Sequence, residues 1–511
     1  MTEYDVIVVG SGLGGLISAA ILSEEGYRVL VLEKNKQHGG NLQIFARNKR
    51  IFDTGVHYIG GLDKGETLYK YFKFLGIMDD LKLHRLDKEG YDIISFEGDP
   101  KEYKFSQGYD LLIENLSKEF PNERAGIEKY CSKLKEICAA FPMYWVEKSS
   151  AETENMELLE LNARDFIASC TTDPKLQKVL AGSNPLYAGD GDATPFYVHA
   201  LVINSYTESA WRCVDGGAQI AHLLIKKIKR TGGIVKNHSE VCKFLFENQV
   251  ATGVELTNGK QYFAKTFISN AHPELTLDMI GEGKLLKAYT KRIRNLKNTS
   301  AIFTLYMVLK PETFPYFNYN YYHYIDDRVW EGTQYDQQTW PPSYALFTGK
   351  SSKSDTHSDS IIAMVYMRFE EVQQWADTFN NVAKRSDREE SYEQFKTRKA
   401  ELLIDALEKK FPNIRDCIAS YYTSTPLTYR DYIGTKDGSM YGIAKDHKSP
   451  FRSLLSPRTK IPNLFLTGQN LVMHGILGVT ISAVKTCTAI LGYDYLMDKI
   501  IASAQAEKIE S

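Results

Sequence analysis

A glycine-rich turn close to the amino terminus constrains the fold of this chain more than any other feature of its sequence. Residues 5–9 read Asp-Val-Ile-Val-Val, a short β-branched run that fits a strand buried on both faces. Gly10, Gly12 and Gly15 follow at once in the spacing G-x-G-x-x-G. The first glycine permits a tight turn, the second lets the backbone approach a diphosphate, and the third lets a helix pack closely on the strand.

The segments after the turn complete a βαβ unit. Residues 16–25 are predicted to form a helix that ends at Gly26, and residues 28–32 the next parallel strand, which ends at Glu33. The start of such a helix offers unpaired N–H groups and a positive dipole end to phosphates. Glu33 lies where a carboxylate accepts hydrogen bonds from both ribose hydroxyls of an adenosine. Together these features predict a dinucleotide site, and a glycine turn in some other α/β fold is the weaker alternative.

The length and composition indicate ordinary globular character with more than one structural unit. A chain of 511 residues exceeds the size at which one hydrophobic core usually stops growing. The 62 basic and 64 acidic side chains nearly cancel, which disfavours nucleic acid as a partner. The seven cysteines are scattered without a C-x-x-C pair, so we expect reduced thiols and no metal site. No signal peptide or membrane-spanning run is recognised, and a cytoplasmic protein is expected.

The middle of the chain alternates between helical and strand-like stretches. Residues 67–145 and 157–231 are predicted to be mainly helical, because their apolar residues recur with a spacing near 3.6. Residues 234–270 contain four short strand-like runs joined by turns that suit hairpins. Residues 299–310 and 360–369 are β-branched and aromatic, and they predict strands of a second sheet.

The carboxyl-terminal part completes the expected division of the chain. Residues 386–411 are predicted to form a long charged helix, and residues 464–467 and 476–491 a strand and a helix around a glycine-rich turn. The sequence therefore predicts an α/β fold with a discontinuous Rossmann-like dinucleotide-binding domain and a second, α+β substrate domain that contains a mixed or antiparallel sheet. The expected division is a cofactor domain over 1–75, 205–285 and 440–511 with the C-terminal helix, a mostly helical cap over 76–204, and a further substrate part over 286–439.

Two further glycine motifs favour FAD over NAD as the dinucleotide. Gly39-Gly40 follows Glu33 after five residues, and such a pair extends the phosphate site in flavoproteins. Gly468-Gln469-Asn470 follows the carboxyl-terminal strand and resembles a second cofactor motif, in which a polar side chain holds the ribityl chain. The hairpin region 234–270 resembles the segment that covers the adenine. A one-domain NAD protein has no need of these distant segments.

With these residues in view, the chain resembles the phytoene desaturase and carotenoid isomerase superfamily of FAD-dependent oxidoreductases, and within it the retinol-saturase branch. The resemblance is carried by residues 8–15, 31–40, 52–61 and 464–491. Two departures stand out. Asn41 lies where many relatives carry Arg or Cys, and Asn470 where relatives usually carry Asp. Both put the redox tuning and the reaction direction in doubt.

The resemblance implies both a cofactor site and a chemistry. The flavin exchanges a hydride with a polyene carbon, so saturation, desaturation or isomerisation of C=C bonds in a long apolar retinoid, carotenoid or related lipid is implied. NAD(P)H is one of the electron donors left open, as are the oligomeric state and peripheral contact with a membrane. The implied cofactor-binding residues are Gly10, Gly12, Leu13, Gly14, Gly15, Glu33, Lys34, Gly39, Gly40, Asn41, Val241, Gly468, Gln469, Asn470, Gly475 and Val479.

Two residues are candidates for catalysis. His57 and Tyr58 lie in the motif FDTGVHYIGG, which the resemblance places near the isoalloxazine ring. His57 is a candidate proton donor, given a pKa near neutrality. The stronger alternative is that both residues only pack against the flavin edge. The aromatic segment 314–347 is expected to pack on its own sheet rather than to line a substrate tunnel.

Two other functions stay open on the sequence alone. One is an amine-oxidase-like flavoenzyme, which shares the architecture, although an arginine after the second glycine pair is missing. The other is a non-catalytic flavoprotein that binds an apolar ligand without turning it over.

Overall fold

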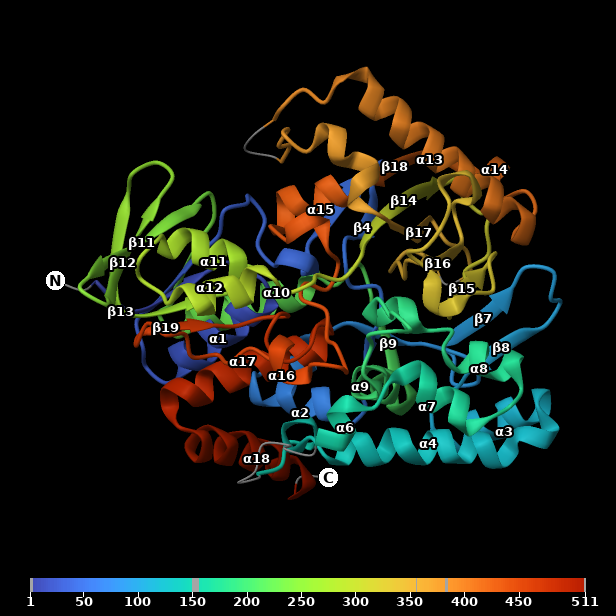
Figure 1. Ribbon diagram of the computed structural model, residues 1–511, viewed down its shortest axis with the longest axis horizontal. Helices are drawn as coiled ribbons and strands as arrows, with labels where there is room; N and C mark the ends of the chain where they lie inside the picture. Colours follow the sequence, from blue (N-terminus) through green and yellow to red (C-terminus); the bar gives the residue numbers. More distant parts are fainter. Residues whose placement is uncertain (1–2, 149–155, 355, 382–384, 510–511) are drawn as a thin grey trace.

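Two seven-stranded sheets dominate the computed structural model, which describes residues 3–148, 156–354, 356–381 and 385–509. Figure 1 shows them side by side, the first on the left and the second on the right. Two smaller sheets, of two and three strands, accompany them in the described part of the chain. The predicted α/β class, with a Rossmann-like unit and a second mixed sheet, is confirmed.

The first sheet contains the predicted βαβ unit. Strand β1 (Tyr4–Val9) pairs in parallel with β2 (Val29–Leu32), and helix α1 (Leu13–Glu24) connects them. This helix begins three residues earlier than predicted, because Gly12 already serves as its N-cap residue. The other strands of the sheet are β10 (Ile234–Lys236), β11 (Val241–Glu247), β12 (Val250–Leu256), β13 (Gln261–Ser269) and β19 (Leu464–Leu466).

The centre of this sheet brings distant parts of the chain together. β13 pairs in parallel with both β1 and β19, so the carboxyl ends of these strands lie at one edge. Helix α17 (Gly475–Leu491) follows β19 and packs against α1. α1 approaches the sheet closely at Gly15, where an added Cβ would lie only 2.2 Å from the Gly10 carbonyl oxygen. A side chain at this position would therefore separate helix and strand.

The second sheet is mixed, since β15 (Asn320–Tyr324) pairs in parallel with β7 (Asp92–Phe96), whereas its other pairs are antiparallel. Helix α13 (Glu389–Lys410) covers one face, where Leu403 and Leu407 join the core of the sheet. The opposite face looks toward the first sheet. The remaining strands are β8 (Glu102–Phe105), β14 (Ala301–Leu309), β16 (Ser343–Thr348), β17 (Ser360–Met367) and β18 (Ile418–Ser424).

The helical interpretation of residues 67–145 is wrong over residues 83–105. This stretch contains β6 (Leu83–Arg85) in addition to β7 and β8. In β8 the buried Tyr103 and Phe105 alternate with the exposed Glu102 and Lys104, which is the period of a strand half covered by a core. Residues 157–231 also contain a strand, β9 (Ala210–Cys213), which pairs with β6. The apolar spacing over such a long stretch is dominated by its helices, so short strands such as β6 and β9 do not change it.

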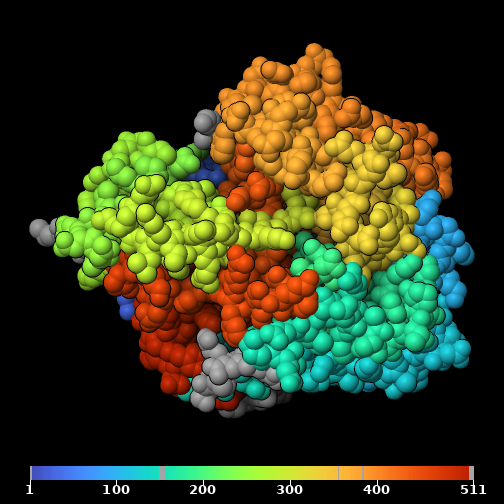
Figure 2. All heavy atoms as spheres, viewed as in Figure 1, coloured from blue at the N-terminus to red at the C-terminus, as the bar shows by residue number. Residues whose placement is uncertain are grey.

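The rest of the described chain consists of small strands and of helices that surround the sheets. Figure 2 shows that the carboxyl-terminal segments, in red, touch both the lime segments of the first sheet and the cyan helices. No helix in the described ranges is both long and apolar enough to cross a membrane. These elements are β3 (Ile44–Arg47), β4 (Arg50–Asp53), β5 (Ile59–Gly60), α2 (Thr67–Phe74), α3 (Tyr109–Glu119), α4 (Arg124–Ala139), α5 (Pro142–Trp145), α6 (Met156–Glu160), α7 (Ala163–Cys170), α8 (Pro174–Leu180), α9 (Phe196–Glu208), α10 (Ala218–Arg230), α11 (Pro273–Ile280), α12 (Lys287–Arg294), α14 (Ile414–Cys417), α15 (Pro426–Ile433), α16 (Pro450–Ser453) and α18 (Tyr493–Ile509).

Candidate cofactor and active site

A cavity of about 480 Å³ lies at the carboxyl ends of the parallel strands of the first sheet. This is the edge at which open α/β sheets bind their ligands. Gly15 lies beneath the cavity, in the contact between α1 and β1. The other sequence-predicted cofactor residues and both candidate catalytic residues line it: Gly10, Gly12, Leu13, Gly14, Glu33, Lys34, Gly39, Gly40, Asn41, His57, Tyr58, Val241, Gly468, Gln469, Asn470, Gly475 and Val479.

The two amino-terminal glycine motifs lie against each other in this cavity. Gly12 and Gly39 form an isolated parallel β-bridge. A Cβ on Gly40 would lie 3.1 Å from the Gly12 Cα, and Gly40 has a φ of +57°. The backbone therefore forms a surface without side chains at the start of α1, where unpaired N–H groups favour an anion.

The carboxylate of Glu33 is held by the chain around it. Its Oε2 accepts hydrogen bonds from the Ser11 backbone N–H at 3.0 Å and from the Ser11 Oγ at 2.6 Å. Its Oε1 accepts one from the Asn35 N–H at 2.8 Å. A carboxylate offers about four acceptor positions. Three of them are used, which leaves room for one strong hydrogen bond to a ribose rather than the two expected.

Asn270 is a site residue that was not predicted from the sequence; it follows β13 and lies between three glycine motifs. An added Cβ on Gly12 would lie 2.6 Å from the Asn270 Nδ2, and added Cβ atoms on Gly14 and Gly468 would lie 2.8 and 2.5 Å from its Oδ1. The amide therefore fills the space that these glycines leave. Its position in the sequence could have predicted this role, because a polar residue at the carboxyl end of a parallel strand lies at the ligand-binding edge of the sheet.

Asn470 holds a loop of the protein rather than presenting its whole amide to the cavity. Its Oδ1 accepts a hydrogen bond from the Ile443 N–H at 2.9 Å. Gly442 passes so close that an added Cβ would lie 2.1 Å from the same oxygen. Gln469, beside it, also lines the cavity. The Asn470 amide oxygen is thus already hydrogen-bonded within the protein. Gln469 is therefore the polar side chain of this motif that is better placed to bind a ligand.

The amino terminus of α17 faces the same cavity. Gly475, Ile476 and Val479 all line it, and His474 precedes the helix as its N-cap residue. The His474 ring stacks on Tyr441 at 4.1 Å between ring centroids. Burial lowers the pKa of His474 to about 4, so its ring is neutral near pH 7. The positive end of this 17-residue helix is thus available to a partly negative ligand group.

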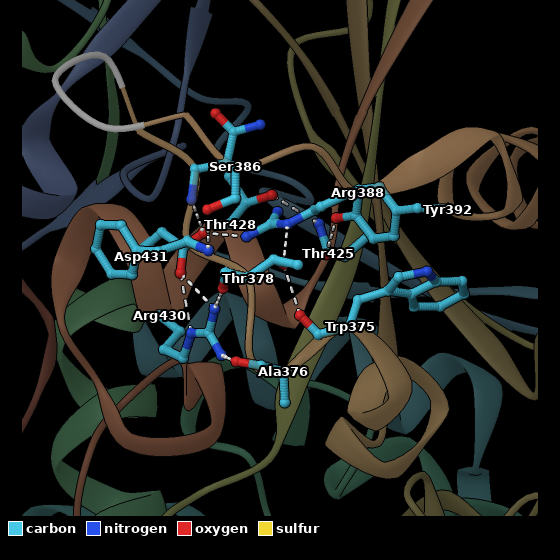
Figure 3. Close-up of polar contacts among 12 residues, drawn as sticks. Trp375, Ala376, Thr378, Ser386, Arg388, Tyr392, Thr425, Thr428, Arg430 and Asp431 are labelled. Carbon is cyan, nitrogen blue, oxygen red and sulfur yellow. Dashed lines mark hydrogen bonds and ion pairs between the residues drawn. The ribbon is translucent and has the colours of Figure 1, made fainter.

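Helix α15 closes the cavity beside Glu33. The Lys34 Nζ donates to the Asp431 carbonyl oxygen at 3.1 Å, and the Asn35 Nδ2 donates to the Tyr432 carbonyl oxygen at 2.8 Å. Figure 3 shows how the Asp431 carboxylate is itself held, with Arg388 and Arg430 converging on it. This cluster of charges holds α15 in place at the end of the cavity beside Glu33.

His57 lies in the cavity as a neutral ring. It stacks on Phe347 at 4.4 Å between ring centroids, and its Nε2 is buried without a partner in the part of the chain that the structure describes. Burial lowers the pKa of His57 to about 3. The premise of a near-neutral pKa, on which its expected role as proton donor rested, is therefore wrong.

A second cavity of about 1190 Å³ adjoins the first. Both cavities are lined by Leu186, Tyr206, His474, Gly475 and Ile476, so they meet at the amino terminus of α17. Much of the remaining lining of the second cavity is apolar. It includes Phe141, Met143, Leu159, Leu201, Leu454 and Ile481.

The aromatic segment 314–347 mainly packs within its own sheet, as predicted. Phe314, Tyr321, Tyr335 and Trp340 belong to the buried core between the second sheet and α13. Tyr322 and Phe347 are exceptions, because strand alternation turns them to the opposite face, where they line the first cavity.

These observations fit a dinucleotide at the first cavity. Glycine backbones leave open space at a helix start, a buried carboxylate lies beyond them, and the Asn41 Oδ1 is a buried acceptor without a partner in the described ranges. The fit comes from backbone atoms and acceptors of the kinds that diphosphate and sugar groups require.

Comparison with known proteins agrees with this geometry. Residues 8–75 match the model of an NAD(P)-binding Rossmann-like domain. The human all-trans-retinol 13,14-reductase is 27% identical over 96% of this chain and 86% of its own length, and prolycopene isomerase 1 of an Oncidium hybrid cultivar is 27% identical over 94% and 83%.

Solved structures share the fold at low sequence identity. An oxidoreductase from Methanosarcina mazei superposes with a TM-score of 0.64 at 17% identity, over 94% of this chain and 98% of its own. A putrescine oxidase bound to putrescine does so with a TM-score of 0.64 at 14% identity, over 96% and 99%. The resemblance found in the sequence is confirmed: the chain is a homologue of the all-trans-retinol 13,14-reductases and prolycopene isomerases and contains a Rossmann-like dinucleotide-binding domain.

Proposed function

We propose that the protein is an FAD-dependent oxidoreductase that acts on C=C bonds of a long apolar polyene, a retinoid or a carotenoid. The observation that carries the proposal is the junction of the two cavities, where a glycine-lined dinucleotide cradle opens into a larger, mainly apolar space beside Tyr206 and Gly475. The names of the homologous reductases and isomerases support the same substrate class.

FAD supplies hydride transfer to or from carbon when it is bound. The residues of the chain bind the cofactor, stabilise its charge and exclude water from the reacting carbons. The glycine backbones around Gly12 bind the diphosphate, and Glu33 holds a ribose hydroxyl. The start of α17 stabilises negative charge on the reduced ring system. Phe347 and Met364 line the cavity with apolar groups and exclude water from the reacting carbons.

An amine-oxidase-like function receives less support. The amine oxidases share the fold with this chain at identities that say nothing of the substrate. A protonated amine also needs an acidic or carbonyl partner where it leaves water. At the junction the shared lining consists of Leu186, Ile476, Gly475 and the neutral rings of Tyr206 and His474, which suits an uncharged hydrocarbon better.

The chemistry of the substrate suggests how it arrives. A polyene dissolves in lipid rather than in water, so peripheral contact with a membrane is part of the proposal. Phe451, whose exposed fraction is 56%, lies at the second cavity and is available for such a contact.

The test is a half-reaction without oxygen. The purified protein is reduced with dithionite and mixed with all-trans-retinol or with a carotenoid, and the flavin absorbance is followed. We expect reoxidation of the flavin together with a product two hydrogens heavier than the substrate. NADPH in place of dithionite tests the proposed electron donor. Failure of every polyene to change the flavin spectrum would contradict the proposed function.

A further inference from the structure

A group of buried polar side chains lies at the wall of the first cavity, next to its junction with the second. Its members are Tyr58, Asp92 and Tyr322. Tyr58 immediately precedes β5, whereas Asp92 and Tyr322 belong to the adjacent strands β7 and β15 of the second sheet. The Tyr58 ring lies 4.3 Å from that of Tyr206, which lines both cavities.

Short hydrogen bonds connect the three side chains into a chain. The Tyr58 hydroxyl oxygen lies 2.8 Å from the Asp92 Oδ2; the phenol donates to an ionised Asp92, and a protonated Asp92 donates to the phenol oxygen, which frees the Tyr58 proton for Tyr322. The hydroxyl oxygens of Tyr58 and Tyr322 are also 2.8 Å apart, and either is able to donate to the other. Tyr58 and Tyr322 line the first cavity, while Asp92, with an exposed fraction of 0%, lies behind them. A proton therefore has a continuous path from the buried carboxyl group to the cavity wall.

The other side of Asp92 is held by an amide and not directly by a cation. The Asn320 Nδ2 donates to the Asp92 Oδ1 at 2.8 Å, and the Asn320 Oδ1 accepts from the Arg212 Nη2 at 2.7 Å. Arg212 also donates to the Tyr319 carbonyl oxygen and to the Thr348 Oγ1. The Arg212 guanidinium group thus donates to several acceptors, and its hydrogen-bonded connection to Asp92 passes through the Asn320 amide.

This arrangement moves the pKa of the carboxyl group to near neutral pH. Burial raises the pKa of Asp92 to about 7, against the lowering effects of the hydrogen bonds from Asn320 and Tyr58 and of the Arg212 charge. The other titratable groups that face it are the phenols of Tyr91, Tyr206 and Tyr322. Burial keeps the pKa of the Tyr58 and Tyr322 phenols well above the usual range, so both remain protonated.

We propose that Tyr322 is the catalytic acid of the C=C chemistry, and that Tyr58 and Asp92 resupply its proton. The inference rests on the proposed function. In saturation, the π bond between two carbons breaks, one carbon gains a hydride from the reduced flavin, and its neighbour gains the Tyr322 proton. Tyr322 then takes the Tyr58 proton and Tyr58 takes that of Asp92. Because Asp92 is wholly buried, its carboxylate regains a proton from water in the emptied cavity through the same two phenols. Tyr322 is the catalytic residue; Asp92 is a positioning residue that acts through the phenols.

The first test compares two neighbouring tyrosines on opposite faces of β15. Tyr322→Phe removes only the hydroxyl group at the cavity. Tyr321→Phe is the matched control, because its hydroxyl bonds Glu102 on the far side of the sheet. The rate at which all-trans-retinol reoxidises the dithionite-reduced holoprotein is expected to fall about 100-fold in Tyr322→Phe and to stay within about twofold in the control. Both variants are expected to keep a full content of flavin.

A second test does not depend on turnover. The infrared spectrum of the wild-type holoprotein near neutral pH is expected to contain the C=O band of a protonated carboxyl group. Because burial also raises the pKa of Asp53 and of Glu208 to about 7, the band of Asp92 is read from the wild-type minus Asp92→Asn difference spectrum. Tyr58→Phe, which keeps the carboxyl group, is expected to shift this band. The reoxidation rate of the wild type is expected to fall as the pH rises through about 7, whereas that of Asp92→Asn is expected to be slow and flat.

The outcomes separate the two proposals. If the wild type is reoxidised by the polyene but Tyr322→Phe is reoxidised at the same rate, the assignment of the acid is overturned and the proposed function stands. A wild-type minus Asp92→Asn difference spectrum without a carboxyl C=O band overturns the resupply of the proton by Asp92. If no polyene reoxidises the wild type, the proposed function fails, and the assignment of the acid fails with it.

Discussion

The two walls of the cofactor cavity are built in different ways. The wall on the first sheet consists largely of backbone: glycines of three motifs approach one another, and the Asn270 amide fills the space between them. The wall on the second sheet consists of side chains that alternate along strands, with Tyr322 and Phe347 turned to the cavity and Tyr321 and Leu346 turned to the core under α13. In the first wall, added Cβ atoms on Gly12, Gly14 and Gly468 would clash with the Asn270 amide, whereas the second wall is formed by side chains.

The difference corresponds to what each wall does. A diphosphate is bound by backbone N–H groups and a helix dipole, which depend on the path of the chain and not on residue type beyond glycine. An apolar substrate and a proton path depend on particular side chains held at particular depths. We therefore expect substitutions in the first wall to change binding of the cofactor and substitutions in the second wall to change the reaction.

The largest expected effect is on the backbone wall. Gly12→Val places a branched side chain where the backbone must approach the diphosphate, and Asn270 already occupies the other side of this space. We expect FAD to bind at least about 100-fold more weakly, which corresponds to about 2.8 kcal/mol. Titration of the apoprotein with FAD, followed by quenching of flavin fluorescence, measures the change. A mutant that keeps stoichiometric flavin would refute the assigned cradle.

The next effect concerns the cluster that joins α15 to the first wall. Asp431 is wholly buried, and it accepts hydrogen bonds from the Arg388 and Arg430 guanidinium groups and from the Asn380 N–H. Asp431→Asn leaves the buried Arg388 and the half-buried Arg430 without this counter-charge, and breaking a buried pair costs about 3 kcal/mol. Urea unfolding of the apoprotein is the measurement. A change below about 1 kcal/mol would show that the arginines find other partners and that this wall does not depend on the cluster.

The smallest effect concerns the side-chain wall and depends on pH. Burial raises the pKa of Asp92 to about 7 in the folded protein, from 3.8 for an ordinary aspartate. The folded state thus binds more protons than the unfolded state between these values, and this contribution to stability is lost as the pH rises. We expect the wild type to lose about 2–3 kcal/mol relative to Asp92→Asn between about pH 5 and about pH 8.

The measurement is urea unfolding of the two apoproteins at a series of pH values. Both proteins share every other titrating group, including Asp53, so the difference between their curves isolates Asp92. A pH-independent difference would mean that Asp92 is ionised in the folded state, and the side-chain wall would then hold a fixed charge and not a proton.

The first wall could be predicted from the sequence because its determinants are local. Gly10, Gly12 and Gly15 lie between a strand and a helix, and Glu33 ends the next strand, so the spacing alone implies their meeting. Distance along the chain did not matter for Gly468, since its motif also follows a strand of the same sheet. The position of each of these residues in the fold therefore follows from its own local motif.

The second wall could not be predicted because its determinants are relations between strands. Nothing in the local sequence of Asp92 shows that it lies beside Asn320, since the register of β7 against β15 pairs residues more than two hundred positions apart. The same stretch was interpreted as helical, which hid the strand itself. For His57 the motif predicted the location, but not the burial that lowers its pKa to about 3. Local patterns predict a backbone site well, and packing decides the chemistry of buried side chains.

The most direct test of the account is the flavin content of the purified protein. The central claim is that the glycine backbones around Gly12 and the start of α17 form a cradle for FAD. The account predicts a yellow protein that releases one FAD per chain on denaturation, measured by absorbance and by mass spectrometry of the released cofactor. A colourless protein that does not bind added FAD would contradict it.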